Sequence, residues 1–256
     1  MEYAKLGHSG IEVSRICLGG MSFGEPSSKF HQWTLPEDET SAVVKRAFEL
    51  GINFIDTANT YSFGTSEEYI GRALRDLGIP RDEVVLASKV FFNEGRLSRE
   101  AILREIDGTL ERLGTDYLDL YIIHRFDYGT PIEETMEALD SLVRAGKVRS
   151  IGLSNFPVHK IEQIMEVARI KPAALQVEIN PYWNQHALKA ELAKIGLGDI
   201  VYEGWYPFGH GDAKLLAEPV IAKIAEAHGK TVAQVILRWM LQEGVVTFPK
   251  TTNPQH

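Results

Sequence analysis

Residues 53–74, "NFIDTANTYSFGTSEEYIGRAL", contain one complete strand–loop–helix unit. The short apolar run around Phe54 and Ile55 is typical of a buried strand, and it ends in Asp56. A polar loop that carries Tyr61 follows, and apolar residues at helical spacing come after it. The unit therefore predicts a β/α arrangement with an aspartate at a strand end and a tyrosine on the loop beyond.

The same alternation of short strands and amphipathic helices runs through almost the whole chain. Strand starts recur at intervals of roughly 25 to 35 residues, the length of one βα unit. The predicted strands are 15–20, 53–57, 83–89, 117–124, 148–155, 174–180, 199–206 and 245–250. The predicted helices are 39–51, 66–78, 98–114, 131–146, 158–170, 186–196, 218–229 and 231–244.

Eight parallel strands separated by helices form either a closed barrel or an open doubly wound sheet. No G-x-G-x-x-G follows the first strand, and the glycine-rich "CLGGMSFGE" at 17–25 does not open a helix. The sequence therefore predicts a (β/α)8 TIM barrel, as a single domain over residues 1–256. The helix expected after the strand at 245–250 is missing from the sequence, and we expect a longer molecule rather than an open flank.

Helix ends are also predicted from local signals. Thr65 with Glu68, and Thr130 with Pro131 and Glu133, are typical of helix N-terminal caps. Five glycines stand where helices are expected to stop, namely Gly51, Gly78, Gly114, Gly146 and Gly229.

Composition excludes several functional classes. The net charge of −8 comes from 35 acidic and 27 basic residues without a run of like charge, which argues against a nucleic-acid or membrane partner. Cys17 is the single cysteine, so a disulfide framework and a cysteine-based zinc site are excluded. His210 and Asp212 form only a weak metal-ligand pair, and no metal is expected. We expect a cytoplasmic location, since the first residues do not resemble a signal peptide. We also expect a monomer.

In a barrel the carboxyl ends of all strands share one face, and active sites lie there. Polar residues at the predicted strand ends are therefore candidates for the site: Asp56 and Tyr61, Lys89, His124, Ser154 and Asn155, Gln176 and Asn180, Tyr206, and Lys250. The first four come from three successive units. They bring a carboxylate, a phenol, an ammonium and an imidazole to one mouth.

These four groups suit the reduction of a carbonyl. Hydride addition to carbon builds negative charge on oxygen, which then needs a proton. A tyrosine with a pKa near 10 needs a shift of about three units, roughly 4 kcal/mol, to donate efficiently near pH 7. A neighbouring lysine about 4 Å away supplies roughly that much, an aspartate keeps the lysine charged, and a histidine donates a hydrogen bond to the substrate oxygen.

Four strand-end motifs, "DTANTY" (56–61), "ASK" (87–89), "YIIH" (121–124) and "IGLSNF" (151–156), resemble the aldo-keto reductase superfamily in order and separation. The resemblance implies that Asp56, Tyr61, Lys89 and His124 form the catalytic tetrad, with Tyr61 as proton donor. It also implies that Ser154, Asn155 and Gln176 hold the nicotinamide carboxamide and that Tyr206 stacks under the nicotinamide ring.

In that family the segment after the last strand binds the 2′-phosphate of NADPH through a lysine, a hydroxyl residue and an arginine. Here Lys250 and Thr251 match, but the arginine position is His256. A neutral imidazole is a weaker phosphate ligand than a guanidinium. The resemblance therefore implies NADPH as cofactor, with NADH accepted at reduced discrimination.

Two further features concern origin and substrate. Up to about residue 150 the chain resembles bacterial reductases of broad aldehyde range, whereas the later part resembles the diketogluconate reductase branch, which predicts a chimera. The segment "SFGEPSSKFHQW" (22–33) is expected to border a small carbonyl substrate. Two rival hypotheses stay open: a Schiff-base aldolase that uses Lys89, and a cofactor-binding regulatory subunit with little turnover.

Overall fold

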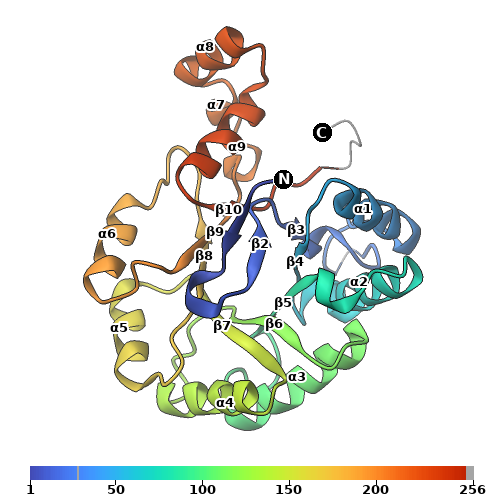
Figure 1. Ribbon diagram of the computed structural model, residues 1–256, viewed down its shortest axis with the longest axis vertical. Helices are drawn as coiled ribbons and strands as arrows, with labels where there is room; N and C mark the ends of the chain where they lie inside the picture. Colours follow the sequence, from blue (N-terminus) through green and yellow to red (C-terminus); the bar gives the residue numbers. More distant parts are fainter. Residues whose placement is uncertain (28, 252–256) are drawn as a thin grey trace.

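The computed structural model describes residues 1–27 and 29–251, and eight parallel strands form its centre. Neighbouring strands pair in the order in which they follow along the chain, as the βα alternation predicts. Figure 1 shows the strands curling around a common centre with helices outside them. The strands are β3 (Leu18–Gly19), β4 (Phe54–Asp56), β5 (Val85–Val90), β6 (Leu118–Ile123), β7 (Val148–Ser154), β8 (Ala174–Glu178), β9 (Val201–Trp205) and β10 (Val246–Thr247).

The first and last strands of the sheet meet through a parallel bridge between Ile16 and Thr247. The Cys17 amide donates to the Thr247 carbonyl at 2.9 Å, and the Thr247 amide donates to the Arg15 carbonyl at 3.1 Å. These bonds join the two edges of the sheet. The (β/α)8 prediction is therefore confirmed, although β3 and β10 are much shorter than the predicted strands.

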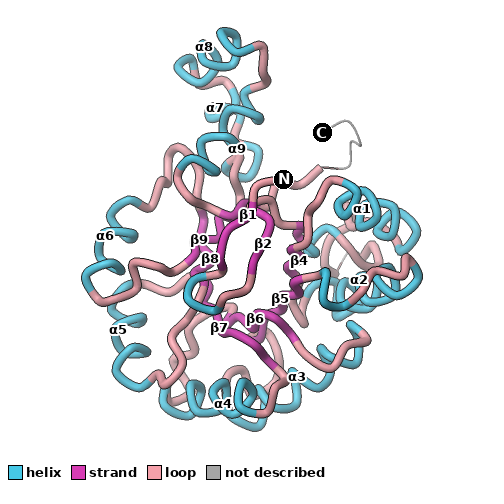
Figure 2. The backbone as a smooth tube through the Cα atoms, viewed as in Figure 1, coloured by secondary structure: helices cyan, strands magenta, loops and turns pink. Residues whose placement is uncertain are grey.

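Most of the helices lie around the sheet on its outer face (Figure 1). The helices of the described residues are α1 (Glu37–Glu49), α2 (Thr65–Asp76), α3 (Arg99–Leu113), α4 (Ile132–Arg144), α5 (Val158–Val167), α6 (His186–Lys194), α7 (Ala213–Leu216), α8 (Pro219–His228) and α9 (Val232–Gln242). Figure 2 shows α7 and α8 extending away from the ring. Irregular chain follows β10 in the described residues up to 251. No helix of the described part is long and apolar enough to cross a membrane.

An N-terminal hairpin, β1 (Tyr3–Lys5) and β2 (Glu12–Ser14), crosses the centre of the ring (Figure 2). Leu6 and Val13 are fully buried, in one apolar cluster with Phe54 and Val85 at the amino ends of β4 and β5. The hairpin thus covers the barrel end opposite the candidate site. Sequence analysis missed it because three-residue strands are too short to show a period.

The predictions of helix ends are right at the C-termini and wrong at the N-termini. The five predicted glycine stops are confirmed, because each adopts a positive φ between 59° and 82°. Both predicted caps are wrong. Gly64 precedes α2, and Thr65 Oγ1 donates to the Ser62 carbonyl, while Thr130 Oγ1 donates to Asp127 before α4. Tertiary partners in the loops therefore compete successfully for these hydroxyl groups.

Close packing of α2 against α3 generates a stability prediction. A Cβ atom at Gly71 of α2 would lie 2.5 Å from the Leu113 carbonyl oxygen, whereas at Gly108 of α3 it would meet only the flexible end of Arg112. We expect Gly71→Ala to destabilise the fold by about 1–3 kcal/mol because backbone must move. Gly108→Ala should instead gain up to about 1 kcal/mol from helix propensity. Urea denaturation of both variants checks this, and a loss of equal size at both positions would contradict it.

Candidate active site

The Lys89 ammonium lies at the centre of the predicted tetrad. Its side chain is fully buried, and Nζ donates to Asp56 Oδ1 at 2.5 Å, to the Thr57 carbonyl at 2.8 Å and to the Tyr61 hydroxyl at 3.1 Å. An ammonium has three protons, and each has an acceptor here. The charge is therefore fully hydrogen-bonded, which makes its burial tolerable.

Strand register explains why Lys89 meets Asp56. Asp56 pairs with Ala87 across β4 and β5, so Lys89 lies two residues farther along and points to the same face. Burial by itself would lower the pKa of Lys89, but the negative charge of Asp56 and the bond to Tyr61 outweigh it, and the pKa lies above its ordinary value. Lys89 therefore stays protonated at any ordinary assay pH.

A tight left-handed turn places Tyr61 over this pair. Ser62 and Phe63, which follow in the short helix η3 (Tyr61–Gly64), have φ values of 47° and 57°. Such backbone is costly for residues other than glycine and persists only where the surroundings fix it. Ser62 Oγ donates to the Phe23 carbonyl at 3.0 Å and holds the turn against the loop after β3.

The acidity of Tyr61 differs from the sequence prediction. Burial raises its pKa above the ordinary value, while the Lys89 ammonium lowers it and only partly offsets the burial. Lys89 thus acts in the predicted direction, but the net shift is upward. Tyr61 is therefore a neutral phenol in this structure.

His124 follows β6, and its half-buried ring stands edge-on to the Tyr61 ring, with 5.9 Å between centroids. Burial, with smaller contributions from Lys89 and Arg125, lowers the pKa of His124 to about 2. The imidazole is therefore neutral. Its buried Nδ1 has no hydrogen-bond partner among the described residues. A neutral imidazole has one N–H donor, which is what the predicted contact to a substrate oxygen requires.

Three of the predicted cofactor residues lie together. Ser154 at the end of β7 pairs with Gln176 of β8, and both are buried. Asn155 has a φ of 60°, its Nδ2 donates to Ser154 Oγ at 2.9 Å, and its amide donates to the Gln176 carbonyl at 3.0 Å. Gln176 Nε2 in turn donates to Asp56 Oδ2 at 3.1 Å, so this group borders the tetrad directly.

The other predicted cofactor residues lie farther out. Tyr206 follows β9 with a φ of 50°, is 37% exposed, and packs its ring against His210. Lys250 Nζ lies 5.5 Å from the Trp33 ring centroid. Thr251 is exposed, and His256 lies outside the described residues. The structure therefore joins Lys250 to the loop after β3 and not to the tetrad.

Aromatic side chains that sequence analysis did not single out border the tetrad. Phe30 lies 6.4 Å from Tyr61 between ring centroids, so segment 22–33 reaches the tetrad, and its contact with a substrate stays a prediction. Phe92 stands edge-on to His124 at 5.0 Å, and its position two residues after β5 was the available signal. Phe63 contacts Phe30 at 6.2 Å. These rings give the mouth an apolar wall.

Sequence analysis also passed over Glu203, a single acid inside the apolar run "IVYEGWY" (200–206). Its side chain is fully buried on β9, and Oε2 accepts a hydrogen bond from Gln176 Nε2 at 2.9 Å. An isolated acid in a strand with both faces covered was the signal that could have found it.

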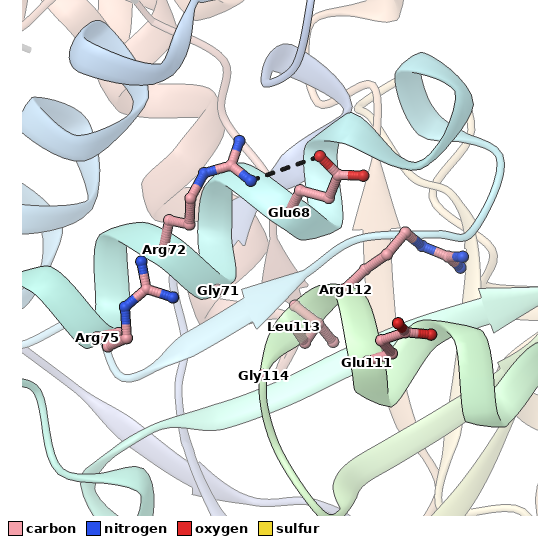
Figure 3. A pocket seen from close by; sticks show the side chains of 8 residues that line it. All are labelled: Glu68, Gly71, Arg72, Arg75, Glu111, Arg112, Leu113 and Gly114. Carbon is pink, nitrogen blue, oxygen red and sulfur yellow. Dashed lines mark hydrogen bonds and ion pairs between the residues drawn. The ribbon is translucent and has the colours of Figure 1, made fainter.

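Figure 3 shows a different hollow, on the outer surface between α2 and α3. Its lining residues are Glu68, Gly71, Arg72, Arg75, Glu111, Arg112, Leu113 and Gly114. All three arginines of this lining already have acidic partners. Arg72 binds Glu37 and Glu68, Arg75 binds Asp76, and Arg112 binds Glu67. The hollow shares no lining residue with the predicted site. Among the described residues, no three His, Cys, Asp or Glu side chains are grouped to hold a metal ion.

Comparisons with known proteins agree with this geometry. Residues 15–256 match the Aldo/keto reductase family. The glyoxal reductase of Bacillus subtilis is 42% identical over 244 residues, 95% of this chain and 80% of that protein. An aldo-keto reductase of Mycolicibacterium smegmatis is 39% identical over 224 residues, 87% of this chain and 78% of that one.

Solved structures give the same result. A thermostable aldo-keto reductase crystallised with the inhibitor epalrestat superposes with a TM-score of 0.87 at 31% identity, covering 100% of this chain and 91% of that one. With the family match over nearly its whole length, the chain belongs to the aldo/keto reductase family.

Proposed function

We propose that the protein is an NADPH-dependent reductase that converts aldehydes or ketones to alcohols, with Tyr61 as proton donor. Membership of the family makes it an oxidoreductase of carbonyl compounds. The observation that carries the finer assignment is the unbroken chain from Asp56 through Lys89 to the Tyr61 hydroxyl. It supplies a positioned proton and a fixed positive charge beside the oxygen that gives it up.

In this proposal a carbonyl oxygen binds between Tyr61 and His124. Bound NADPH supplies the hydride for the carbonyl carbon. The neutral His124 ring donates a hydrogen bond that orients the oxygen, and Tyr61 transfers its proton as negative charge develops there. The Lys89 ammonium then stabilises the phenolate that remains, while Asp56 keeps Lys89 charged and aimed.

The chain's own residues fit a nicotinamide cofactor. Both protons of Gln176 Nε2 go to carboxyl oxygens, so its amide oxygen is left to accept from a carboxamide. Ser154 is adjacent in register and adds a hydroxyl group. The partly exposed ring of Tyr206 offers a stacking surface, and Lys250 offers a cation for the 2′-phosphate. NADPH is therefore favoured over NADH.

The rival functions have less support. A Schiff-base aldolase needs a neutral, accessible lysine, but Lys89 is fully buried and protonated, with three acceptors. Borohydride trapping with a carbonyl compound would label Lys89 if that rival were correct. A regulatory subunit would bind NADPH tightly with negligible turnover, and the complete tetrad speaks against it.

The substrate stays at the level of a class. The names of similar proteins range from glyoxal reductase to the morphine 6-dehydrogenase of Pseudomonas putida, which is 36% identical over 231 residues, 85% of this chain and 75% of that one. The apolar wall of Phe30 and Phe92 favours carbonyl compounds with an apolar substituent. A cytoplasmic location, a monomeric state and a chimeric origin stay predictions.

Tyr61→Phe tests the proton donor. Loss of the hydroxyl removes general-acid catalysis, so we expect carbonyl-dependent NADPH oxidation to fall at least about 100-fold while NADPH affinity changes little. Tyr3→Phe is the matched control, because the Tyr3 hydroxyl donates to the Gly51 carbonyl and is remote from the site. Absorbance at the NADPH band and fluorescence titration measure the two quantities. Equal reduction rates for Tyr61→Phe and the parent would overturn the assignment.

Lys250→Ala tests the cofactor preference. A charge-assisted bond to the 2′-phosphate exists only with NADPH, so its loss should weaken NADPH about tenfold or more and leave NADH almost unchanged. Dissociation constants for both nucleotides give the comparison. A uniform loss for the two would show that Lys250 does not bind the 2′-phosphate.

A further inference from the structure

Glu203 stands in the barrel interior next to the residues that border the tetrad. It pairs in register with Gln176 of β8 on one side and with Val246 of β10 on the other. None of its surface is exposed. Water therefore does not solvate this carboxyl group, and its neighbours alone decide its charge.

Gln176 connects Glu203 to the catalytic chain. Its single Nε2 group donates to Glu203 Oε2 at 2.9 Å and to Asp56 Oδ2 at 3.1 Å. An amide nitrogen has two protons, so both are used. Two carboxyl acceptors also fix which end of the amide faces Asp56 and Glu203, and the amide oxygen takes no part in either bond. Asp56 binds Lys89, and Lys89 binds Tyr61, so four hydrogen bonds run from Glu203 to the proton donor.

The second oxygen of Glu203 is unusual. Oε1 is buried and has no hydrogen-bond partner among the described residues. An ionised carboxylate with a bare oxygen in such a place is more costly than a protonated acid. Burial, together with the charge of Asp56, raises the pKa of Glu203 to about 8. Geometry and electrostatics thus both describe a neutral acid at neutral pH.

We propose that Glu203 is a positioning residue for the reduction. As a neutral acid it anchors the Gln176 amide and adds no charge to the Asp56–Lys89 pair. When Glu203 ionises, its negative charge opposes the formation of the Tyr61 phenolate. This ionisation sets the alkaline limit of carbonyl reduction. The inference rests on the proposed function, since it concerns the step in which Tyr61 gives up its proton.

The other titratable groups near Glu203 are Lys89, Asp56 and Cys17. Lys89 of β5 stays protonated. Burial raises the pKa of Asp56 of β4, but its pairing with the Lys89 ammonium opposes that rise, so Asp56 stays ionised as the partner of that ammonium. Burial, with the charges of Asp56 and Glu203, raises the pKa of the Cys17 thiol well above its ordinary value, so Cys17 stays neutral. The neighbouring strands β8 and β10 present Gln176 and Val246 at this level, and neither residue titrates. Glu203 is thus the group whose charge changes near pH 8.

A first experiment measures the protonation of Glu203 without using activity. A carboxyl group whose pKa is raised on folding binds more protons in the native state between the unfolded and folded values. Stability of the parent should therefore fall as pH rises from 4.5 to about 8, relative to a variant without this acid. We expect the melting temperature of Glu203→Gln to exceed that of the parent by a margin that grows between pH 5 and pH 8.5. A difference in melting temperature that stays constant with pH would overturn the inference that Glu203 is a neutral acid.

A second experiment measures the coupling to chemistry. Steady-state reduction with saturating NADPH is followed from pH 6 to pH 10. The reduction rate of the parent should fall above about pH 8. At pH 9 the rate of Glu203→Gln should be about threefold or more that of the parent, because no negative charge appears beside the tetrad in the variant. Glu203→Met serves as a second variant of similar volume, which also cannot ionise, in case Glu203→Gln does not fold.

Glu67→Gln is the matched control. Glu67 is another fully buried acid, paired with Arg112 at 2.6 Å and accepting from Ser88 at 2.6 Å on the outer side of the sheet. Its loss should reduce stability and leave the pH profile of reduction as in the parent. Turnover with the same pH profile in the parent and both Glu203 variants overturns the inference alone. Absence of carbonyl-dependent NADPH oxidation in the parent at every pH overturns the proposed function and the inference with it.

Discussion

The site depends on one positive charge, the Lys89 ammonium, held inside a ring of apolar strands. A buried ammonium is stable only if each of its protons finds an acceptor, and Asp56, the Thr57 carbonyl and Tyr61 are those acceptors. This requirement depends on the register between β4 and β5 and on the path of the loop that follows β4. The left-handed turn at Ser62 and Phe63 is tolerated because it delivers Tyr61 to the ammonium.

The same interior contains a second carboxyl group, and the two acids behave differently because their neighbours differ. Asp56 is paired with Lys89, whereas Glu203 accepts a single hydrogen bond from the described residues, donated by an amide. Environments that separate two carboxyl groups in this way are common where one must remain charged and the other must not. Gln176 lies between them and donates a hydrogen bond to each.

The strand-end logic that predicted the site holds because of backbone geometry. Parallel strands with helical crossovers bring every carboxyl end to one face, so Asp56, Lys89 and His124 had to converge once the barrel closed. Their contacts with Gln176 and Phe30 depend on strand register and loop path, which residue spacing does not encode. The predicted caps at Thr65 and Thr130 failed for the same reason: hydroxyl groups bind whichever partner the tertiary fold supplies.

The sequence by itself determined the alternation of strands and helices and the glycine stops, and it predicted the four tetrad residues, because periodicity and residue type act locally. Only the tertiary structure decided that the N-terminal hairpin covers the far end of the barrel, that burial outweighs Lys89 in the acidity of Tyr61, and that Glu203 is an inward-facing acid. Those outcomes depend on how much water reaches each group, and solvent exclusion is a property of packed neighbours far apart in the chain.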